Sequence, residues 1–286
     1  MQKHIVTIDK KKGVYQITTT SERWYTITSK NKETGLPEYQ FIPSVTWITG
    51  YVYKGIGFYK WLAKTGWNEA EAIKEEAGDK GTKVHNAIEQ LILGAEVKME
   101  DKYYSKLTEK DEELNPDEYG AILSFQDWFN TTKPEPIMQE STVISKKHNF
   151  AGTVDFVGKI DGDIWIVDWK TSQYVWPSME AQLSAYKRGL QEQGRNVDKV
   201  RLAVLQVGYK RNKRGWKFTE VEDQFDEMFL PAQKFWDKDN KNKEPKQVEM
   251  PLSLKLDLTK TEEPEVSAPK KVQTTSKAKA IAKKAK

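Results

Sequence analysis

Two aspartates and a lysine lie in a strand-like part of the chain and together could hydrolyse a phosphodiester. Asp155 precedes the turn Asp161-Gly162, and Asp168 and Lys170 follow it. Because side chains alternate along a strand, Asp168 and Lys170 point to one face while Trp169 points away. An Asp-Gly turn is typical of a tight hairpin, which would bring Asp155 to the same edge.

The surroundings of Asp168 make its charge costly unless a partner offsets it. It follows Ile164–Val167, an apolar run of the kind that is buried on both faces, where an unpaired carboxylate is unfavourable. A divalent ion held by two carboxylates would stabilise a phosphate and generate hydroxide near neutral pH. Lys170 could orient or deprotonate the water and offset charge. The alternative is a buried Asp–Lys ion pair without catalysis.

The absence of cysteine limits the cofactors. The chain has no Cys, which excludes disulfides, thiolate nucleophiles, Cys-ligated zinc and an iron–sulfur cluster. Any metal must be bound by carboxylates, histidine or carbonyl oxygens, and these ligands favour a hard divalent ion.

The elements that must position these residues follow from the apolar periodicity. Three successive strands are predicted, and helical and strand patterns then alternate. This order predicts an α/β fold with a mixed sheet flanked by helices. The predicted segments are strands 138–146, 150–160 and 164–169, a helix over 178–190, a strand over 200–207, its hairpin partner 216–221 and a helix over 224–236.

The first half of the chain combines short strands with helices. Strands are predicted over 5–8, 14–18 and 24–28, and a helical region over 58–77, interrupted near Gly66. The clearest helix, 82–93, has one apolar stripe with His85 beside it. The charged stretch 96–118 then leads into a helix that ends near Phe129.

Charge and composition divide the chain into three parts. We expect a β-rich segment at 1–50 packed on the core, a main domain at 51–240 and a disordered Lys-rich tail at 241–286. Residues 267–286 contain seven lysines and no acid, so subtracting them from the net charge of +4 leaves −3. Any nucleic-acid surface on the body must therefore be a local patch. The tail could add non-specific DNA affinity, improve solubility or tether a partner.

The composition also bears on location. Ten Trp and twelve Tyr indicate a packed core, no run approaches 18 apolar residues, and no apolar signal region begins the chain. We expect a soluble cytoplasmic protein, in a host cytoplasm if the source is viral, without a membrane partner.

Four ordered motifs resemble a known family. They are Gly81-x-x-x-His85, Gly152-x-x-Asp155, Asp168-x-Lys170 after an apolar run, and Gln182-x-x-x-Tyr186. Over about residues 20–190 this order resembles the RecB-like branch of the PD-(D/E)xK nucleases. Pro43-Ser44-Val45-Thr46 before a Trp-containing helix is similar to phage and mitochondrial genome maintenance exonucleases.

The resemblance implies a restriction-endonuclease-like core and a role for each matched residue. Asp155, Asp168, His85 and the Trp169 carbonyl would bind Mg²⁺ or Mn²⁺, and Lys170 would be the catalytic lysine. The family motif also places Gln182 and Tyr186 at the active site, in contact with DNA or with the lysine.

Two further acids could belong to the site, and three of the motif residues have an alternative, structural interpretation. Glu140 could add an acidic group to the site, and Glu89 could orient the His85 imidazole or simply face solvent. His85 itself could be structural, as could Gln182 and Tyr186.

A basic hairpin with aromatic flanks is a candidate DNA contact. Phosphate contacts and base stacking would suit single-stranded or frayed DNA, although a solvated turn has the same composition. The residues are Lys210, Arg211, Lys213, Arg214 and Trp216.

The resemblance favours a Mg²⁺- or Mn²⁺-dependent deoxyribonuclease acting on single strands or duplex ends. Its branch favours an exonuclease in phage-type recombination, replication or DNA processing, working with a single-strand-binding or recombination protein. The alternatives are a non-catalytic DNA-binding or assembly protein on a nuclease fold and a nuclease of RNA.

Overall fold

A computed structural model describes residues 4–9, 13–18, 22–35, 37–196, 199–241 and 244–245. The described residues all belong to one compact unit, Met1–Glu249. Within them, none of the helices combines the length and apolar character that a membrane crossing requires. The tail predicted to be disordered lies, from residue 246 onward, outside the described residues.

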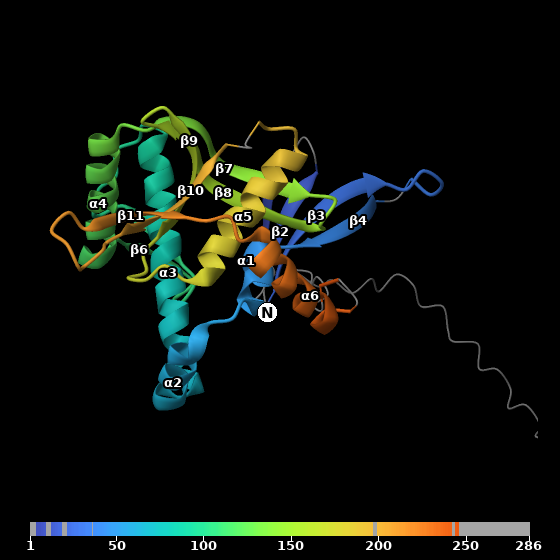
Figure 1. Cartoon of the computed structure of the whole chain (residues 1–286), viewed down its shortest axis with the longest axis horizontal. Coiled ribbons are helices and arrows are strands. Elements are labelled where there is room, and N and C mark those ends of the chain that lie inside the picture. The colour runs from blue at the N-terminus through green and yellow to red at the C-terminus, as the bar shows by residue number, and fades with distance from the viewer. Residues whose placement is uncertain are drawn as a thin grey trace, which may run out of the picture. The chain divides into compact units, whose positions relative to one another are not determined.

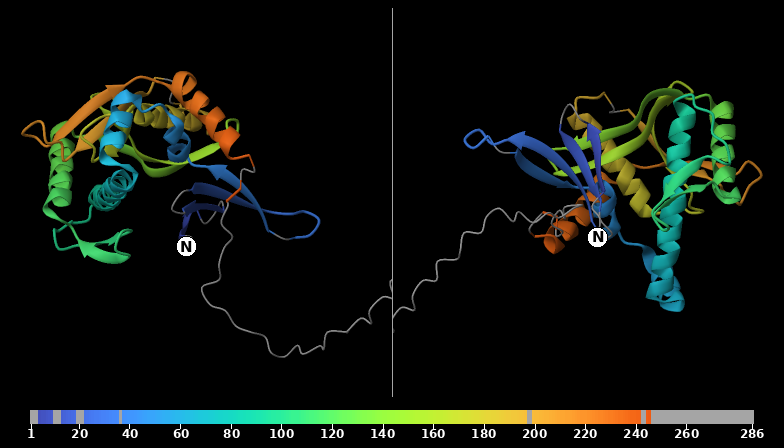
Figure 2. Two further views of the ribbon diagram at one scale, coloured as in Figure 1. Left: turned by 90° about the horizontal axis from the view of Figure 1, so that it is seen from below. Right: turned by 180° about the vertical axis from the view of Figure 1, so that it is seen from behind.

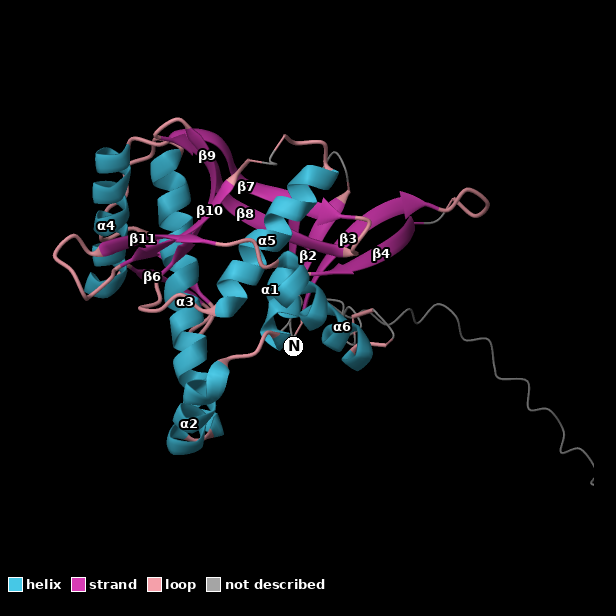
Figure 3. Ribbon diagram, viewed as in Figure 1, coloured by secondary structure: helices cyan, strands magenta, loops and turns pink. Residues whose placement is uncertain are grey.

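The centre of the molecule is a five-stranded mixed sheet in the order β11-β10-β9-β8-β7 (Figure 1). Only β9 and β10 pair in parallel, and the other neighbours are antiparallel. The strands are β7 (Glu135–Ser145), β8 (Phe150–Ile160), β9 (Asp163–Lys170), β10 (Arg201–Val207) and β11 (Trp216–Val221). Helices lie around this sheet in Figure 3, and the predicted α/β fold with a restriction-endonuclease-like core is confirmed.

Helices cover both faces of the sheet because β9 and β10 are apolar on both sides. Ile166 and Val204 pack into one core with α1 (Val45–Ile48), α5 (Pro177–Glu192) and α6 (Leu230–Asp239). Val167 and Leu205 alternate with them and pack into a second core with α3 (Trp67–Ile92) and α4 (Pro116–Thr132). Burying each such side chain contributes roughly 1.5–3 kcal/mol, so the two faces hold β9 firmly between helices.

The N-terminal strands form a second sheet, seen apart from the central sheet in Figure 2. Its order is β1 (His4–Asp9), β2 (Val14–Thr18), β3 (Arg23–Lys30) and β4 (Pro37–Pro43), of which the first three were predicted and β4 was not. Tyr25 packs against Ala151 of β8, and its hydroxyl lies 3.0 Å from Thr153 Oγ1. The N-terminal sheet therefore contacts the strand that carries Asp155.

The long helix α3 differs from the two separate helices that were predicted. The expected break near Gly66 is present, where φ is +86° between α2 (Gly55–Thr65) and α3. Beyond it α3 continues for 26 residues through Gly78 and Gly81, each of which costs only about 1 kcal/mol relative to alanine. The short α1 is capped at its N-terminus by Ser44, whose side chain accepts from the Trp47 N–H, and a 3₁₀ turn (Thr49–Tyr51) follows.

Two further elements depart from prediction. The charged stretch contains an unpredicted hairpin, β5 (Lys102–Ser105) and β6 (Lys110–Glu113), before α4 begins with a capping box at Asn115. The predicted helix 224–236 is instead a π-helical turn, Phe225–Phe229, followed by α6. Pro231 lacks an N–H and therefore suits the first turn of a new helix.

Candidate functional site

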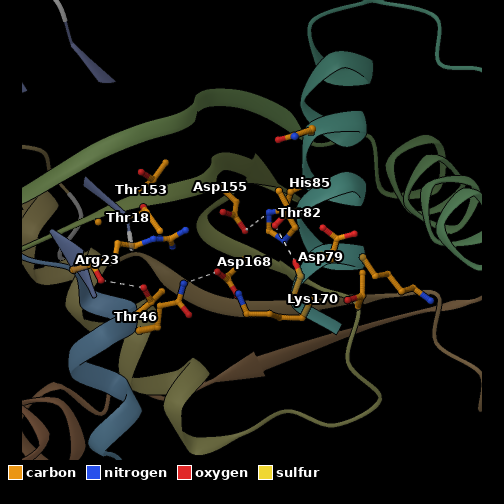
Figure 4. Close-up of a pocket in the computed structure, with 18 of the residues that line it drawn as sticks. Thr18, Arg23, Thr46, Asp79, Thr82, His85, Thr153, Asp155, Asp168 and Lys170 are labelled. Atoms are coloured by element: carbon orange, nitrogen blue, oxygen red, sulfur yellow. Dashed lines mark hydrogen bonds and ion pairs between the residues drawn. The ribbon is translucent and has the colours of Figure 1, made fainter. Parts of the chain in front are cut away.

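Asp155 and Asp168 lie where β8 and β9 separate. The ladder between these strands has its last pair at Phe156 and Val167, and the next residue on each strand is an aspartate. Asp155 Oδ2 accepts the backbone N–H of Trp169 at 2.9 Å, in place of a backbone carbonyl. This bond fixes the Asp155 carboxylate at the strand end, beside Asp168 (Figure 4).

Helix α5 contributes a hydrogen bond that holds the Asp168 carboxylate. Gln182 Nε2 donates to Asp168 Oδ1 at 2.9 Å and to the Tyr186 hydroxyl at 2.9 Å. All three side chains are buried, so the amide holds the carboxylate in one orientation. Gln182 thus contacts the aspartate, and its partners in the described residues do not include Lys170.

Lys170 emerges from the last position of β9 on the same side as Asp168. Its Nζ forms an ion pair with Asp168 Oδ2, and its side chain is 22% exposed whereas that of Asp168 is 1% exposed. The ammonium group therefore reaches the pocket while its carboxylate partner stays buried. The alternation predicted for β9 is confirmed, because Trp169 packs on the other side with Phe125 and Trp128.

His85 faces the strand ends from α3. Its Nε2 lies 2.9 Å from the Trp169 carbonyl oxygen, which can only accept, so Nε2 carries the proton. Burial, followed by the charge of Lys170, lowers the pKa of His85 to about 4, and the imidazole is neutral at pH 7. Its unprotonated Nδ1 lies 3.7 Å from Asp155 Oδ2 and is available as a metal ligand.

Glu140 completes the acidic cluster from β7. The β7–β8 register places it opposite Asp155, and its φ of +39° is unusual for a residue with a side chain. One ligand atom from each of Glu140, Asp155 and His85 can be chosen so that all lie within 4.8 Å of one another. Burial, and next the charge of Asp155, raise the pKa of Glu140 to about 8.

The electrostatics of the cluster fit a divalent cation. Burial raises the pKa of Asp155, and it raises the pKa of Asp168 to about 6 despite the nearby Lys170. Asp168 Oδ2 is buried and, among the described residues, its one ion-pair partner is Lys170. Carboxylate oxygens with one imidazole nitrogen are ligands for Mg²⁺ or Mn²⁺. The Trp169 carbonyl has a second lone pair, so its bond to His85 does not prevent ligation.

The cluster opens into a pocket of about 1240 Å³ that the N-terminal sheet helps to line. Among the cations there that sequence reasoning missed are Arg23 of β3 and Lys106, in the turn of the β5–β6 hairpin. Burial lowers the pKa of Lys106, and the charge of Arg23 lowers it further, which indicates that the two cations are close together. Neither shares a motif with the acids, and only the fold brings them to the pocket.

The other sequence candidates are divided between this pocket and the hairpin that joins β10 to β11. Glu89 lines the pocket, where its charge adds to the raised pKa of Glu140. The basic hairpin does not line it: Lys210 pairs with Asp117 at 3.1 Å, and Trp216 Nε1 donates to Asp127 at 2.7 Å. The structure therefore gathers the metal-site candidates and leaves the hairpin as a separate surface.

Comparison with protein families agrees with this arrangement. The model of the PD-(D/E)XK nuclease superfamily matches residues 58–278. The match covers more than half of the chain, which therefore belongs to the PD-(D/E)XK nuclease superfamily, a family of metal-dependent nucleases. A search of curated proteins found no match.

Proposed function

We propose that this protein is a Mg²⁺- or Mn²⁺-dependent deoxyribonuclease, and specifically an exonuclease of the RecB-like, phage-type branch. The observation that carries the proposal is the convergence of Asp155, Asp168 and Lys170 with His85 in one pocket. The motif order that resembles phage exonucleases supports the exonuclease assignment. A role in DNA recombination, replication or processing follows from the same resemblance.

Each residue of the centre has a distinct task in this proposal. Asp155, Asp168 and His85 hold the cation, with Glu140 and the Trp169 carbonyl as further ligands. When bound, the cation supplies Lewis-acid stabilisation of the phosphate and acidifies water. Lys170 orients the attacking water and offsets negative charge in the transition state. Gln182, supported by Tyr186, keeps Asp168 in its ligating orientation.

Recognition of DNA requires cations, because the backbone contributes most of the affinity. Arg23 and Lys106 line the pocket and are suited to bind phosphates next to the scissile one. The hairpin residues Lys210, Lys213 and Arg214 form a second basic surface that would guide the strand. A single-strand-binding or recombination protein in the cytoplasm is the partner that fits this role.

The test is digestion of end-labelled single-stranded and duplex DNA, with RNA as a third substrate, in Mg²⁺ or Mn²⁺. We expect metal-dependent cleavage that falls at least about 100-fold in Lys170→Ala. Lys159→Ala is the matched control, because Lys159 lies next to the turn between β8 and β9, away from the acidic pocket, and is 47% exposed. Its digestion rate should equal that of the wild type.

The products distinguish the alternatives. Mononucleotides or short oligonucleotides released only from strands with free ends support an exonuclease, whereas cleavage of circular DNA supports an endonuclease. Cleavage of RNA alone would favour the RNA-directed alternative. Intact DNA binding without cleavage in either metal would favour a non-catalytic DNA-binding or assembly protein.

A further inference from the structure

A second pocket, separate from the acidic centre, is lined by aromatic side chains. It has a volume of about 1010 Å³ and lies between α2, the first turns of α3 and the loop before α5. In Figure 1, α2 projects beyond the sheets at the end of α3. The aromatic groove, as we call it, is defined by Tyr53, Tyr59, Trp61, Trp67, Tyr174 and Trp176.

These rings are unusually exposed for residues that normally form a core. Tyr53 and Trp67 are each 68% exposed, and Tyr174 is 55% exposed. They lie in loose groups, with 6.2 Å between the centroids of Tyr53 and Tyr59 and 5.9 Å between those of Tyr174 and Trp176. An exposed cluster of this kind marks a binding surface, because solvation of so much apolar area is costly.

The charges at the aromatic groove favour an anionic occupant. Its only lining acid, Glu71, pairs with Lys74 at 3.1 Å, whereas Lys54 has no ion pair among the described residues and lies 4.8 Å from the Phe58 ring centroid. Arg211 of the basic hairpin lies 4.3 Å from the ring of Tyr174. Flat rings interspersed with cations are the combination that binds stacked bases and their phosphates.

The aromatic groove adjoins the acidic pocket. Ala77 lines both. The loop after β9 also connects them, since Thr171 and Ser172 line the acidic pocket while Tyr174 and Trp176 line the aromatic groove. Lys170 begins this loop, so a ligand in the aromatic groove lies next to the chain segment that carries the catalytic lysine.

We propose that the aromatic groove binds a single DNA strand through base stacking and leads it to the acidic centre. This inference rests on the proposed nuclease function and adds its substrate class, an unpaired strand of several nucleotides. Exposed bases stack on the rings of α2, α3 and the 171–176 loop, and Lys54 and Arg211 contact the phosphates. Duplex DNA, whose bases are already stacked on one another, binds the aromatic groove weakly.

The test is fluorescence anisotropy in EDTA with two labelled strands of equal length, an oligothymidylate and an abasic strand that has phosphates but no bases. We expect Trp67→Ala combined with Tyr174→Ala to weaken oligothymidylate binding at least about tenfold, and abasic-strand binding by less than about twofold. The matched control is Tyr39→Ala combined with Phe235→Ala, because both rings are exposed and lie outside the aromatic groove. Trp67→Phe, which retains a ring, should keep most of the affinity.

Three results would overturn the proposal: unchanged oligothymidylate binding in the double variant, equal losses on both strands, or equal losses in Trp67→Phe and Trp67→Ala. A wild-type dimer that the double variant dissociates, with strand binding unchanged, would assign the surface to a second copy of the chain. Binding in EDTA needs no catalysis, so the digestion assay tests the nuclease function independently.

Discussion

Helix α3 contacts two clusters of buried carboxylates, which differ in how many of the carboxylates pair with a lysine. In one, Lys83 is surrounded by Glu112 at 2.8 Å, Asp79 at 3.4 Å and Glu118 at 3.6 Å. The other brings Glu140, Asp155 and His85 together, with Asp168 beside Asp155, and among the described residues Lys170 forms its ion pair with Asp168 alone. Each cluster has three carboxylates and one lysine, but Lys83 lies within 4 Å of all three of its carboxylates, whereas Lys170 pairs with Asp168.

The pKa values of the carboxylates also differ between the clusters, being lowered at Glu112 and raised at the acidic centre. The hydrogen bond from Lys83 lowers the pKa of Glu112, so that acid is stabilised as a carboxylate. Burial alone would lower the pKa of Lys83, but its three carboxylates raise it overall. At the acidic centre, burial raises the pKa of Asp155, Asp168 and Glu140. A buried carboxylate cluster is therefore a candidate metal site when most of its carboxylates have no lysine partner and their pKa values are raised.

The largest expected effect compares the same acid-to-amide change in the two clusters. Asp168→Asn removes a proposed metal ligand and should reduce Mn²⁺-dependent DNA cleavage at least about 1000-fold. Glu118→Gln alters the Lys83 cluster at a residue that does not line the acidic pocket, and should leave the rate per folded molecule within about threefold of the wild type. Initial rates, normalised to the folded fraction from circular dichroism, measure both. Similar losses in the two variants would refute the distinction between the clusters.

Removing the resident cation should primarily affect stability. Lys83→Met leaves three carboxylates with no cation among them, and we expect the free energy of unfolding to fall by about 3–5 kcal/mol. The neighbouring ion pair of Lys80 with Asp117, at 3.5 Å, is more exposed, and Lys80→Met should cost less than about 1 kcal/mol. Urea denaturation measures both changes, and equal losses would show that burial of Lys83 is irrelevant.

Ionisation of Asp168 should destabilise the metal-free protein above about pH 6. The pKa of Asp168 is raised from its ordinary 3.8 to about 6, so the folded state binds the proton more tightly than the unfolded state. The ionised group therefore costs stability above pH 6, and this cost disappears below about pH 4. In EDTA at pH 8, Asp168→Asn should stabilise the fold by about 1–3 kcal/mol, and at pH 3.5 by nothing measurable.

Excess Mn²⁺ provides the complementary measurement. It should stabilise the wild type at pH 8 and shift the Asp168→Asn variant much less, because the variant lacks a ligand. Thermal melts with and without the metal test this. An Asp168→Asn variant that is less stable than the wild type in EDTA at pH 8 would contradict the destabilisation that we attribute to the ionised Asp168 carboxylate.

The smallest expected effect concerns the groups that orient each cluster. Gln182→Leu removes the donor to Asp168 Oδ1 and should weaken Mn²⁺ binding on the order of tenfold. Ser105→Ala removes the corresponding donor to Asp79 Oδ2, at 2.9 Å, and should cost about 1 kcal/mol without changing Mn²⁺ affinity. Calorimetric titration and denaturation separate the two effects, and an altered Mn²⁺ affinity in Ser105→Ala would contradict the comparison.

The central sheet and the aspartates at the point where β8 and β9 separate were predictable because their signals are local. Alternation in β7 and β8, the apolar run of β9 and the Asp161-Gly162 turn each occupy a few neighbouring residues. The turn fixes the hairpin register, and the register then brings Asp155 next to Asp168. Glu140 was a weaker prediction, since its position depends on a φ of +39° that no sequence pattern indicates.

The missed features depend on contacts between distant segments. The β5–β6 hairpin occupies a stretch so charged that its sequence predicts no strand, yet Ser105 Oγ and the Lys106 N–H both donate to Asp79 of α3. Arg23 reaches the acidic pocket only because the N-terminal sheet packs on β8. Such residues carry no motif, and their partners are far away in the sequence.

The continuity of α3 makes it a molecular ruler. Trp67 begins this helix and His85 lies 18 positions later, which at 1.5 Å per residue corresponds to roughly 27 Å along a stiff axis. An oligonucleotide shorter than this span cannot stack on Trp67 and reach the acidic centre at once. Degradation should therefore slow abruptly once a strand falls below that length, so the length of α3 would set the size of the final products.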